Sequence, residues 1–162
     1  MALSAHQQIA EVVRDHIAAW SGLPADVTVQ RVRSVLHQLQ NLAADVVATI
    51  CVTCVQVDSE KADRSSDRDE VGIGVVLIAG LDSNDTTEAD TWDLVTDQLR
   101  DYLRRLRLVT LDNGYKAERM RTVLPTPHDA DMLYSSELFV SVIRSDYSLP
   151  IQVGSDIAAG GP

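Results

Sequence analysis

The segment VVATICVTCVQVDSEKADRSSDRDEVGIGVVLIAGL, residues 46–81, is the strongest indicator of the fold of this chain because it holds two strongly β-forming runs. Residues 46–57 and 71–81 are dense in valine and isoleucine, which favour extended strands. The thirteen residues between them, 58–70, include nine charged side chains. Such a stretch is too polar to join a core and too long for a tight turn. We therefore predict an antiparallel hairpin at about residues 46–81, whose charged tip forms a mobile or extended arm.

The two cysteines of the chain, Cys51 and Cys54, lie in the first of these strands with the spacing C-x-x-C. This spacing occurs in redox sites and in half of a zinc site, so a small thiol enzyme that uses both residues is one hypothesis. In a strand, however, residues three apart point to opposite faces, with Cα atoms about 10 Å apart. Zinc would also need two further ligands, and no second C-x-x-C or H-x-x-x-H supplies them. We interpret both cysteines as structural residues on opposite faces.

Helices and strands are expected on both sides of the hairpin. Ser4 followed by Gln7 is a capping-box pattern, and apolar residues then recur at helical spacing as far as Trp20. A longer helix is expected over about residues 88–108, where acidic side chains precede basic ones as the helix dipole favours. The other expected elements are strands at residues 27–33, 118–124 and 137–147 and a short helix at about 129–135, with residues 35–44 undecided between a short helix and an irregular connection.

These elements predict a single α+β domain over residues 1–150. An N-terminal helix and one long central helix are expected to pack on a small mixed, mainly antiparallel sheet. Gly72 and Gly74 alternate onto one face of the second hairpin strand, where we expect the central helix to approach closely. Residues 151–162 have little to bury, and a flexible C-terminal tail is expected there.

The composition narrows the class of function. A formal net charge of -10 opposes tight binding to a phosphate backbone, although an acidic surface suits DNA that slides past without sticking. The N-terminus lacks the pattern of a secretory signal, and no apolar run approaches the roughly 20 residues of a membrane helix. We expect a protein that is soluble and cytoplasmic at synthesis.

Two acidic or histidine-containing stretches have some features of a functional site. Residues 82–93 place oxygen-bearing side chains at alternate positions, as a calcium loop does, but Thr87 stands where that loop needs glycine, and helix capping explains the same residues. His128, Asp129 and Asp131 follow a Pro-Thr-Pro turn without a nucleophile motif, so a helix cap is the better interpretation. No phosphate-cradling or dinucleotide-binding glycine motif is present. We therefore expect no catalytic, cofactor-binding or metal site.

Four stretches, in this order along the chain, carry a resemblance to a known family. They are VTVQRVR at residues 27–33, the hairpin at 46–81, ADTWDLVTDQLRDYL at 89–103 and HDADMLYSSELFVSVIRSDY at 128–147. Together they resemble the tail terminator and neck proteins, which join head to tail in tailed bacteriophages. The resemblance covers roughly residues 5–148.

The resemblance implies a structural virion protein, with no enzymatic activity and no cofactor. It implies a ring, expected to be a hexamer, that caps the tail tube, ends tube polymerisation and joins the tail to the head. Its expected partners are other copies of the chain, the tail tube and neck or connector proteins, with DNA passing through the lumen, no membrane, and assembly in the host bacterial cytoplasm. A head-completion or stopper ring of the same neck region is the alternative.

The hairpin tip is the expected subunit interface. Its arginines can meet carboxylates on a neighbouring copy. The alternative is a solvated loop that contacts no other subunit. The residues expected at this interface are Asp63, Arg64, Asp67, Arg68 and Asp69.

Overall fold

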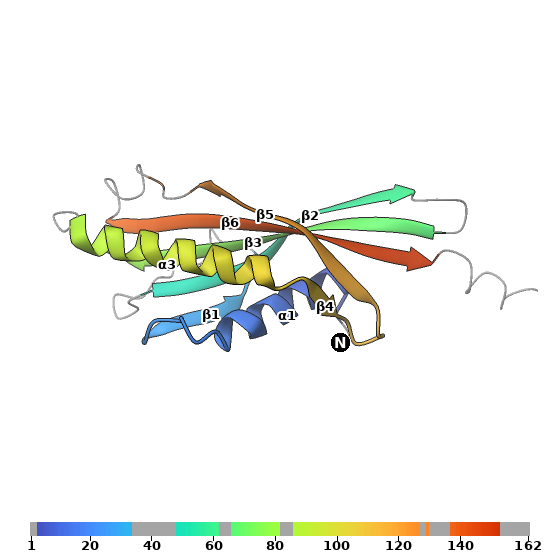
Figure 1. The fold of residues 1–162 in the computed structure, drawn as a ribbon, viewed down its shortest axis with the longest axis horizontal. Coiled ribbons are helices and arrows are strands. Elements are labelled where there is room, and N and C mark those ends of the chain that lie inside the picture. Colours follow the sequence, from blue (N-terminus) through green and yellow to red (C-terminus); the bar gives the residue numbers. More distant parts are fainter. Residues whose placement is uncertain are drawn as a thin grey trace, which may run out of the picture.

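The computed structural model describes residues 3–33, 48–61, 66–81, 86–126, 129 and 137–152 (Figure 1). Within these ranges the chain forms two helices and six strands. In chain order they are α1 (Ala5–Ala18), β1 (Val27–Arg31), β2 (Ala48–Lys61), β3 (Ser66–Gly80), α3 (Thr86–Arg105), β4 (Leu108–Thr110), β5 (Lys116–Thr126) and β6 (Leu138–Gln152). The undecided segment 35–44 and the expected short helix at 129–135 lie outside the described residues, apart from Asp129.

The six strands form one sheet in the order β1-β2-β3-β6-β5-β4. β1 runs parallel to β2, and every other neighbouring pair is antiparallel. This arrangement confirms the α+β class, the mainly antiparallel sheet and the hairpin of β2 and β3. The last strand, β6, lies in the middle of the sheet and pairs with β3 from Leu138 opposite Gly80 to Gln152 opposite Ser66.

Both helices pack on one face of the sheet, and the main core lies between them and the strands (Figure 1). The Gln7 side chain accepts a hydrogen bond of 3.3 Å from the Ser4 amide, as the capping pattern predicts. Alternate residues of each strand point into the core, since side chains alternate along a strand. The core side chains of α1, β3 and α3 include Ile9, Val13, Ile17, Val71, Ile73, Val75, Leu77, Leu99 and Leu103.

The opposite face carries a second, smaller apolar cluster of Cys51, Val76, Ile78 and Val140. Gly72 and Gly74 belong to this face, so the expectation that they admit the central helix is wrong. A Cβ at Gly74 would meet side chains of β2, and one at Gly72 would meet side chains of β6. The glycines make room within the sheet surface itself and not for a helix.

Several boundaries differ from those that the sequence predicts. α3 ends at Arg105, because the residues that follow form β4 and pair with the start of β5. The turn between β4 and β5 includes Gly114, whose positive φ of 84° suits glycine. The strand predicted at 118–124 extends over Lys116–Thr126, and the one predicted at 137–147 extends to Gln152.

The expected extended arm is a continuation of the sheet. β2 and β3 remain paired as far as Lys61 opposite Asp67, and β6 continues beside β3 to Gln152. We call residues 55–61, 66–70 and 150–152 of these three strands the arm. Figure 1 shows the three strands running on past the end of α3 at one end of the molecule. Pairing to a third strand explains how so polar a hairpin stays extended, because an isolated two-stranded hairpin is only marginally stable.

Candidate functional site

β2 places the two cysteines on opposite faces of the sheet, as the sequence predicts. Cys51 is fully buried in the smaller cluster, whereas Cys54 packs at the margin of the main core and is partly exposed. Burial raises the pKa of both thiols, so less thiolate forms at neutral pH than at an ordinary cysteine. Neither the placement nor the ionisation of these residues supports thiol chemistry.

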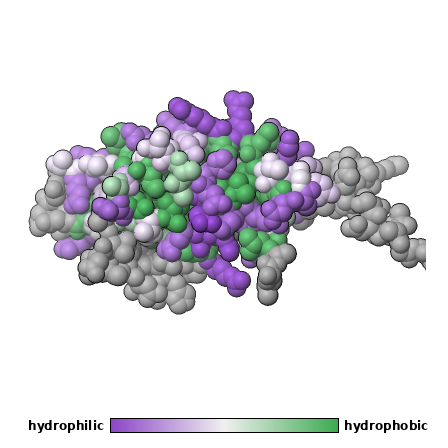
Figure 2. Space-filling model, turned by 90° about the horizontal axis from the view of Figure 1, so that it is seen from below, coloured by the Kyte–Doolittle hydropathy of each residue, from purple (hydrophilic) through white to green (hydrophobic). Residues whose placement is uncertain are grey.

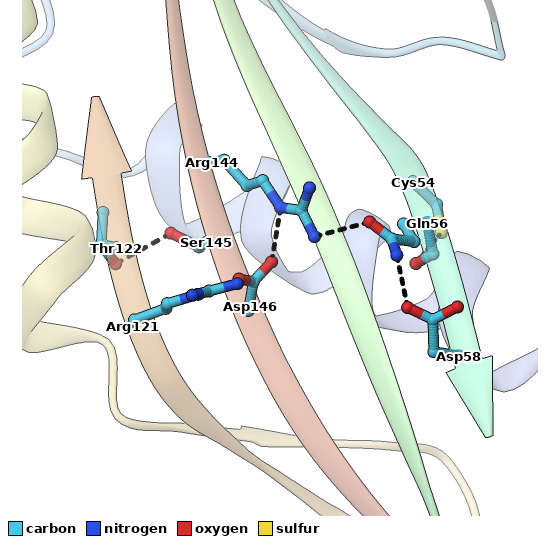
Figure 3. A network of polar contacts seen from close by, with 8 residues as sticks. All are labelled: Cys54, Gln56, Asp58, Arg121, Thr122, Arg144, Ser145 and Asp146. Atoms are coloured by element: carbon cyan, nitrogen blue, oxygen red, sulfur yellow. Dashed lines mark hydrogen bonds and ion pairs between the residues drawn. The ribbon is translucent and has the colours of Figure 1, made fainter. Parts of the chain in front are cut away.

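A row of polar side chains crosses the sheet on the face opposite the helices (Figure 3). At its centre, Asp146 of β6 is fully buried and accepts hydrogen bonds from Arg144 Nε (2.7 Å) and Arg121 Nε (2.5 Å). Arg144 also donates from Nη2 to Gln56 Oε1 of β2 over 2.8 Å, and the Gln56 amide donates to Asp58. We call Gln56, Asp58, Arg121, Arg144 and Asp146 the polar ladder.

The ladder determines the charge of Asp146. Burial alone would raise the pKa of this carboxyl group, but hydrogen bonds from Arg144 and Arg121 and their positive charges outweigh that effect and lower the pKa. The bond with Asp146 in turn raises the pKa of Arg121. Asp146 is therefore an anion at neutral pH, and the pair of arginines satisfies the buried charge as such a charge requires.

Gly72 makes the ladder possible. It lies in β3, between Asp146 of β6 and Gln56 of β2, and is opposite both in register. A Cβ on Gly72 would approach Arg144 Nη2 to 3.1 Å and Asp146 Oδ1 to 3.2 Å. Because glycine leaves this surface open, the Arg144 side chain can cross β3 and reach β2. The ladder is not among the sites that the sequence predicts, although a glycine inside a strand is a signal of close approach.

The ladder presents a cationic group to solvent. The Arg121 side chain is 63% exposed, although its Nε is held by a carboxylate that is fully buried. An arginine held in place loses less side-chain entropy when it binds than a free one does. The arrangement therefore suits contact with a carboxylate of another protein.

The structure describes part of the predicted hairpin interface. Asp63 and Arg64 lie outside the described residues. Asp67, Arg68 and Asp69 belong to β3 in the arm, where Arg68 is opposite Glu60 of β2 and Pro150 of β6. The Arg68 side chain is exposed, and Asp69 is partly buried. β3 thus places these three residues on the arm. Two ladder residues, Gln56 and Asp58, also belong to the arm, whereas Arg121, Arg144 and Asp146 lie outside it on β5 and β6.

A pocket of about 310 Å³ opens where β1 ends beside β2. Its lining includes His6 of α1, Arg31 and Arg33 at the end of β1, and Cys54, Val55 and Val57 of β2. Arg31 is paired with Glu11 over 2.6 Å, so its charge is already partly neutralised. The pocket therefore brings residues of α1 and the end of β1 beside β2 at Thr53–Val57.

Exposed apolar side chains concentrate on particular strands. Within the described residues the large ones are Val55, Val57, Leu94, Leu108, Tyr115, Met120 and Val123. Six of these seven lie on β2, β4 or β5 or in the turn between β4 and β5, and one lies on α3. Figure 2 shows a face on which a hydrophilic band separates two hydrophobic areas, so the apolar surface there is divided into patches.

The other candidate sites gain no support from the described residues. Glu88, Asp90 and Asp93, from the stretch that shares some features with a calcium loop, lie within α3, and residues 82–85 are outside the described ranges. Asp129 is described without His128 or Asp131. In the part of the chain that the structure describes, no three histidine, cysteine or acidic residues gather as metal ligands would. Neither of the described helices has the length and hydrophobicity needed to cross a membrane.

Comparison with known proteins does not assign this chain to a family. No protein-family model matches the chain, and a search of curated proteins finds no significant similarity. The features that bear on function are therefore the arm, the ladder and the charge of the molecule.

Proposed function

We propose that this chain is a structural assembly protein of a tailed bacteriophage, the tail terminator. In this role copies associate into a ring, expected to be a hexamer, which caps the tail tube, ends its polymerisation and joins the tail to the head. The observation that carries the proposal is the arm, a three-stranded extension of the sheet that continues past the end of α3 (Figure 1). A subunit that repeats around a ring needs a surface for each of two neighbours, and the arm provides one that projects from the body.

The charge of the chain fits this role. The formal net charge of -10 lowers the adhesion of DNA that has to pass through a lumen. The proposal also includes partners beyond the ring, namely the tail tube and the neck or connector proteins. The expected location is the neck of the virion, after assembly in the host cytoplasm.

A head-completion or stopper ring of the connector is the second candidate. It shares the small α+β subunit and the ring symmetry, so the same arm supports it. The two roles differ in what the ring contacts: a terminator arrests the growth of tail-tube polymers, whereas a stopper binds the connector and leaves tube growth unchanged.

The first experiment measures assembly and tube arrest together. Native mass spectrometry of the purified chain should give the mass of an oligomer with one fixed number of copies. Electron microscopy should show shorter tail tubes when the chain is added to polymerising tube protein. Arg68→Glu, on the exposed part of the arm, should lower assembly at least tenfold, because it reverses the charge of an arginine that is expected to meet a carboxylate on a neighbouring copy. Arg105→Glu, an exposed residue of α3 outside the arm, is the matched control and should leave assembly unchanged.

Two outcomes would contradict the proposal. A chain that stays monomeric at all concentrations, with and without tail-tube protein, has no ring-forming role. A ring that leaves tube growth unaffected but binds the connector identifies the stopper role instead.

A further inference from the structure

Two stretches of strand edge have no neighbour within the described part of the sheet. β1 covers the edge of β2 only over Ala48–Val52, so residues 53–61 have no described strand on their outer side. β4 covers β5 only over residues 116–118, and the Arg119 amide then donates to the Arg107 carbonyl. Residues 120–124, which precede Pro125, have no described strand on their outer side. Unpaired edges present free amide and carbonyl groups that another strand can bind.

The side chains along both edges are exposed and apolar at several positions. Val55 and Val57 on β2 are 53% and 42% exposed, and Met120 and Val123 on β5 are 51% and 40% exposed. These four residues make up most of the large exposed apolar side chains among the described residues. Soluble proteins usually protect open edges with charges or short strands, so apolar edges of this kind mark a contact surface.

The charges on the two edges are complementary. The β2 edge at residues 53–61 holds two acidic side chains and one basic one, a net charge of -1, and the whole arm holds five acidic and two basic ones, a net charge of -3. β5 holds three basic side chains and one acidic one, a net charge of +2. Arg121 of β5 is the exposed, preoriented end of the polar ladder. A basic strand is unusual in a chain whose net charge is -10, and the acidic arm of another copy matches it.

The edges also have the positions that a ring requires. β2 lies toward one side of the sheet and β5 toward the other, with β3 and β6 between them. A contact from the edge of β2 in one copy to the edge of β5 in the next is heterologous, and such contacts close into rings when the rotation between copies allows it. The register shifts once in β2, at Val55, and twice in β5, at Met120 and between Val123 and Thr126, so a partner strand has to match a bent edge and not a flat one.

We infer that neighbouring copies of this chain join edge to edge, with the open edge of β2 along residues 53–61 pairing with the open edge of β5 along residues 120–124 of the next copy. This inference rests on the proposed assembly function and names its interface. The arm of each copy then lies along the basic face of β5 in its neighbour, and the sheet continues from subunit to subunit.

The test uses charge at the edges. Val55→Lys and Val123→Glu should each raise at least tenfold the concentration at which half of the chains assemble, because each places a desolvated charge at the edge and opposes the charge of the partner edge. Leu94→Lys is the matched control, since Leu94 is 58% exposed but lies on α3, and it should assemble as the unmodified chain does. Thermal unfolding of each variant checks that the fold is retained.

Cross-linking tests which edges meet. In a Cys54→Ala background, Val55→Cys and Val123→Cys chains carrying different tags are co-expressed and treated with a short bismaleimide, whose reach tolerates a shift of register. Both positions lie on the face opposite the helices, so a β2-to-β5 contact brings them together. We expect linked dimers only between the two kinds of chain.

The outcomes distinguish a failure of the edge inference from a failure of the proposed terminator function. If the unmodified chain assembles and arrests tubes while the edge variants also assemble, or while Val55→Cys links mainly to itself, the edge inference is wrong and the terminator role stands. If the unmodified chain never assembles, both are wrong.

Discussion

At the scale of single residues, Gly72 leaves room for the Arg144 side chain of β6 to cross β3 and bond to Gln56 of β2. Its replacement by alanine requires no unusual backbone conformation, because Gly72 does not have a positive φ. The obstacle is the Arg144 guanidinium, whose Cζ would lie 3.3 Å from the new Cβ. The side chain therefore has to move away from Gln56 or from Asp146.

Gly72→Ala should lower the free energy of unfolding by about 1 kcal/mol, through the displaced Arg144 contacts. Gly80→Ala in the same strand is the control, because nothing lies within 4 Å of its Cβ position. It should leave stability unchanged or raise it by about 0.4–1 kcal/mol, since alanine reduces the entropy of the unfolded chain. Urea unfolding of both variants measures the difference, and equal effects would mean that Gly72 has no role in the ladder.

Asp146 should make stability depend on pH in a particular direction. Its folded-state pKa is lower than the ordinary value of 3.8, so its ionised form stabilises the fold above that value. This stability is lost as the pH falls through the lower, folded-state pKa. Asp146→Asn should cost about 2 kcal/mol at pH 7, a value kept modest because Arg121 is largely exposed.

The difference in the free energy of unfolding between the unmodified chain and Asp146→Asn should therefore become smaller as the pH falls below 3.8. Denaturant unfolding at a series of pH values measures it. Asp112→Asn, at an exposed position in the turn after β4, should show no comparable difference. A gap between Asp146→Asn and the unmodified chain that stays constant down to strong acid would mean that the ladder does not hold this carboxylate ionised.

At the scale of elements, β2 shows what alternation along a strand can and cannot predict. The opposite placement of Cys51 and Cys54 follows from the two-residue period and is confirmed. After Cys54, however, a bulge shifts the register, so that Val57 pairs with Val71 of the core face while Gln56 joins the ladder. No sequence period indicates a bulge, and for that reason the ladder could not be predicted.

The two thiols of β2 allow a test that separates a structural protein from a thiol enzyme. A Cys51→Ala, Cys54→Ala double variant should fold and assemble as the unmodified chain does, with a small loss of stability from the space left at Cys51. In the unmodified chain, Cys54 should react slowly with a thiol reagent and Cys51 only after unfolding, because the Cys51 side chain is shielded from solvent by its neighbours. Rapid reaction of both thiols in the folded chain would revive the thiol-enzyme hypothesis.

Other elements were predictable to different degrees. The capped helix α1 and the hairpin of β2 and β3 followed from local patterns. The predicted central helix extended to about residue 108 and so included the start of β4, and the pairing of Leu108 with Glu118 of β5 shows that a strand begins there. The parallel pairing of β1 with β2 joins segments far apart in the sequence, and nothing in either segment specifies that direction.

At the scale of the whole molecule, attraction between the arm and β5 acts against a general repulsion, since each copy carries a net charge of -10. Repulsion between distant exposed charges is screened beyond about 8 Å at physiological salt, whereas charges in direct contact are screened less. The proposed rings are therefore best sought near ~0.15 M salt. The edge variants and the Arg68 variant share these conditions, which makes their losses of assembly comparable.

The central position of β6 has a consequence for biosynthesis. β6 is the last described strand to leave the ribosome, yet within the described sheet it is the only strand that joins the β1-β2-β3 half to the β5-β4 half. A nascent chain that has not reached Leu138 has both halves without the strand that connects them, and the edges of β3 and β5 are then unpaired. Completion of the sheet is thus delayed until Leu138–Gln152 has been synthesised, so a shorter nascent chain lacks the continuous sheet that the proposed contacts between copies require.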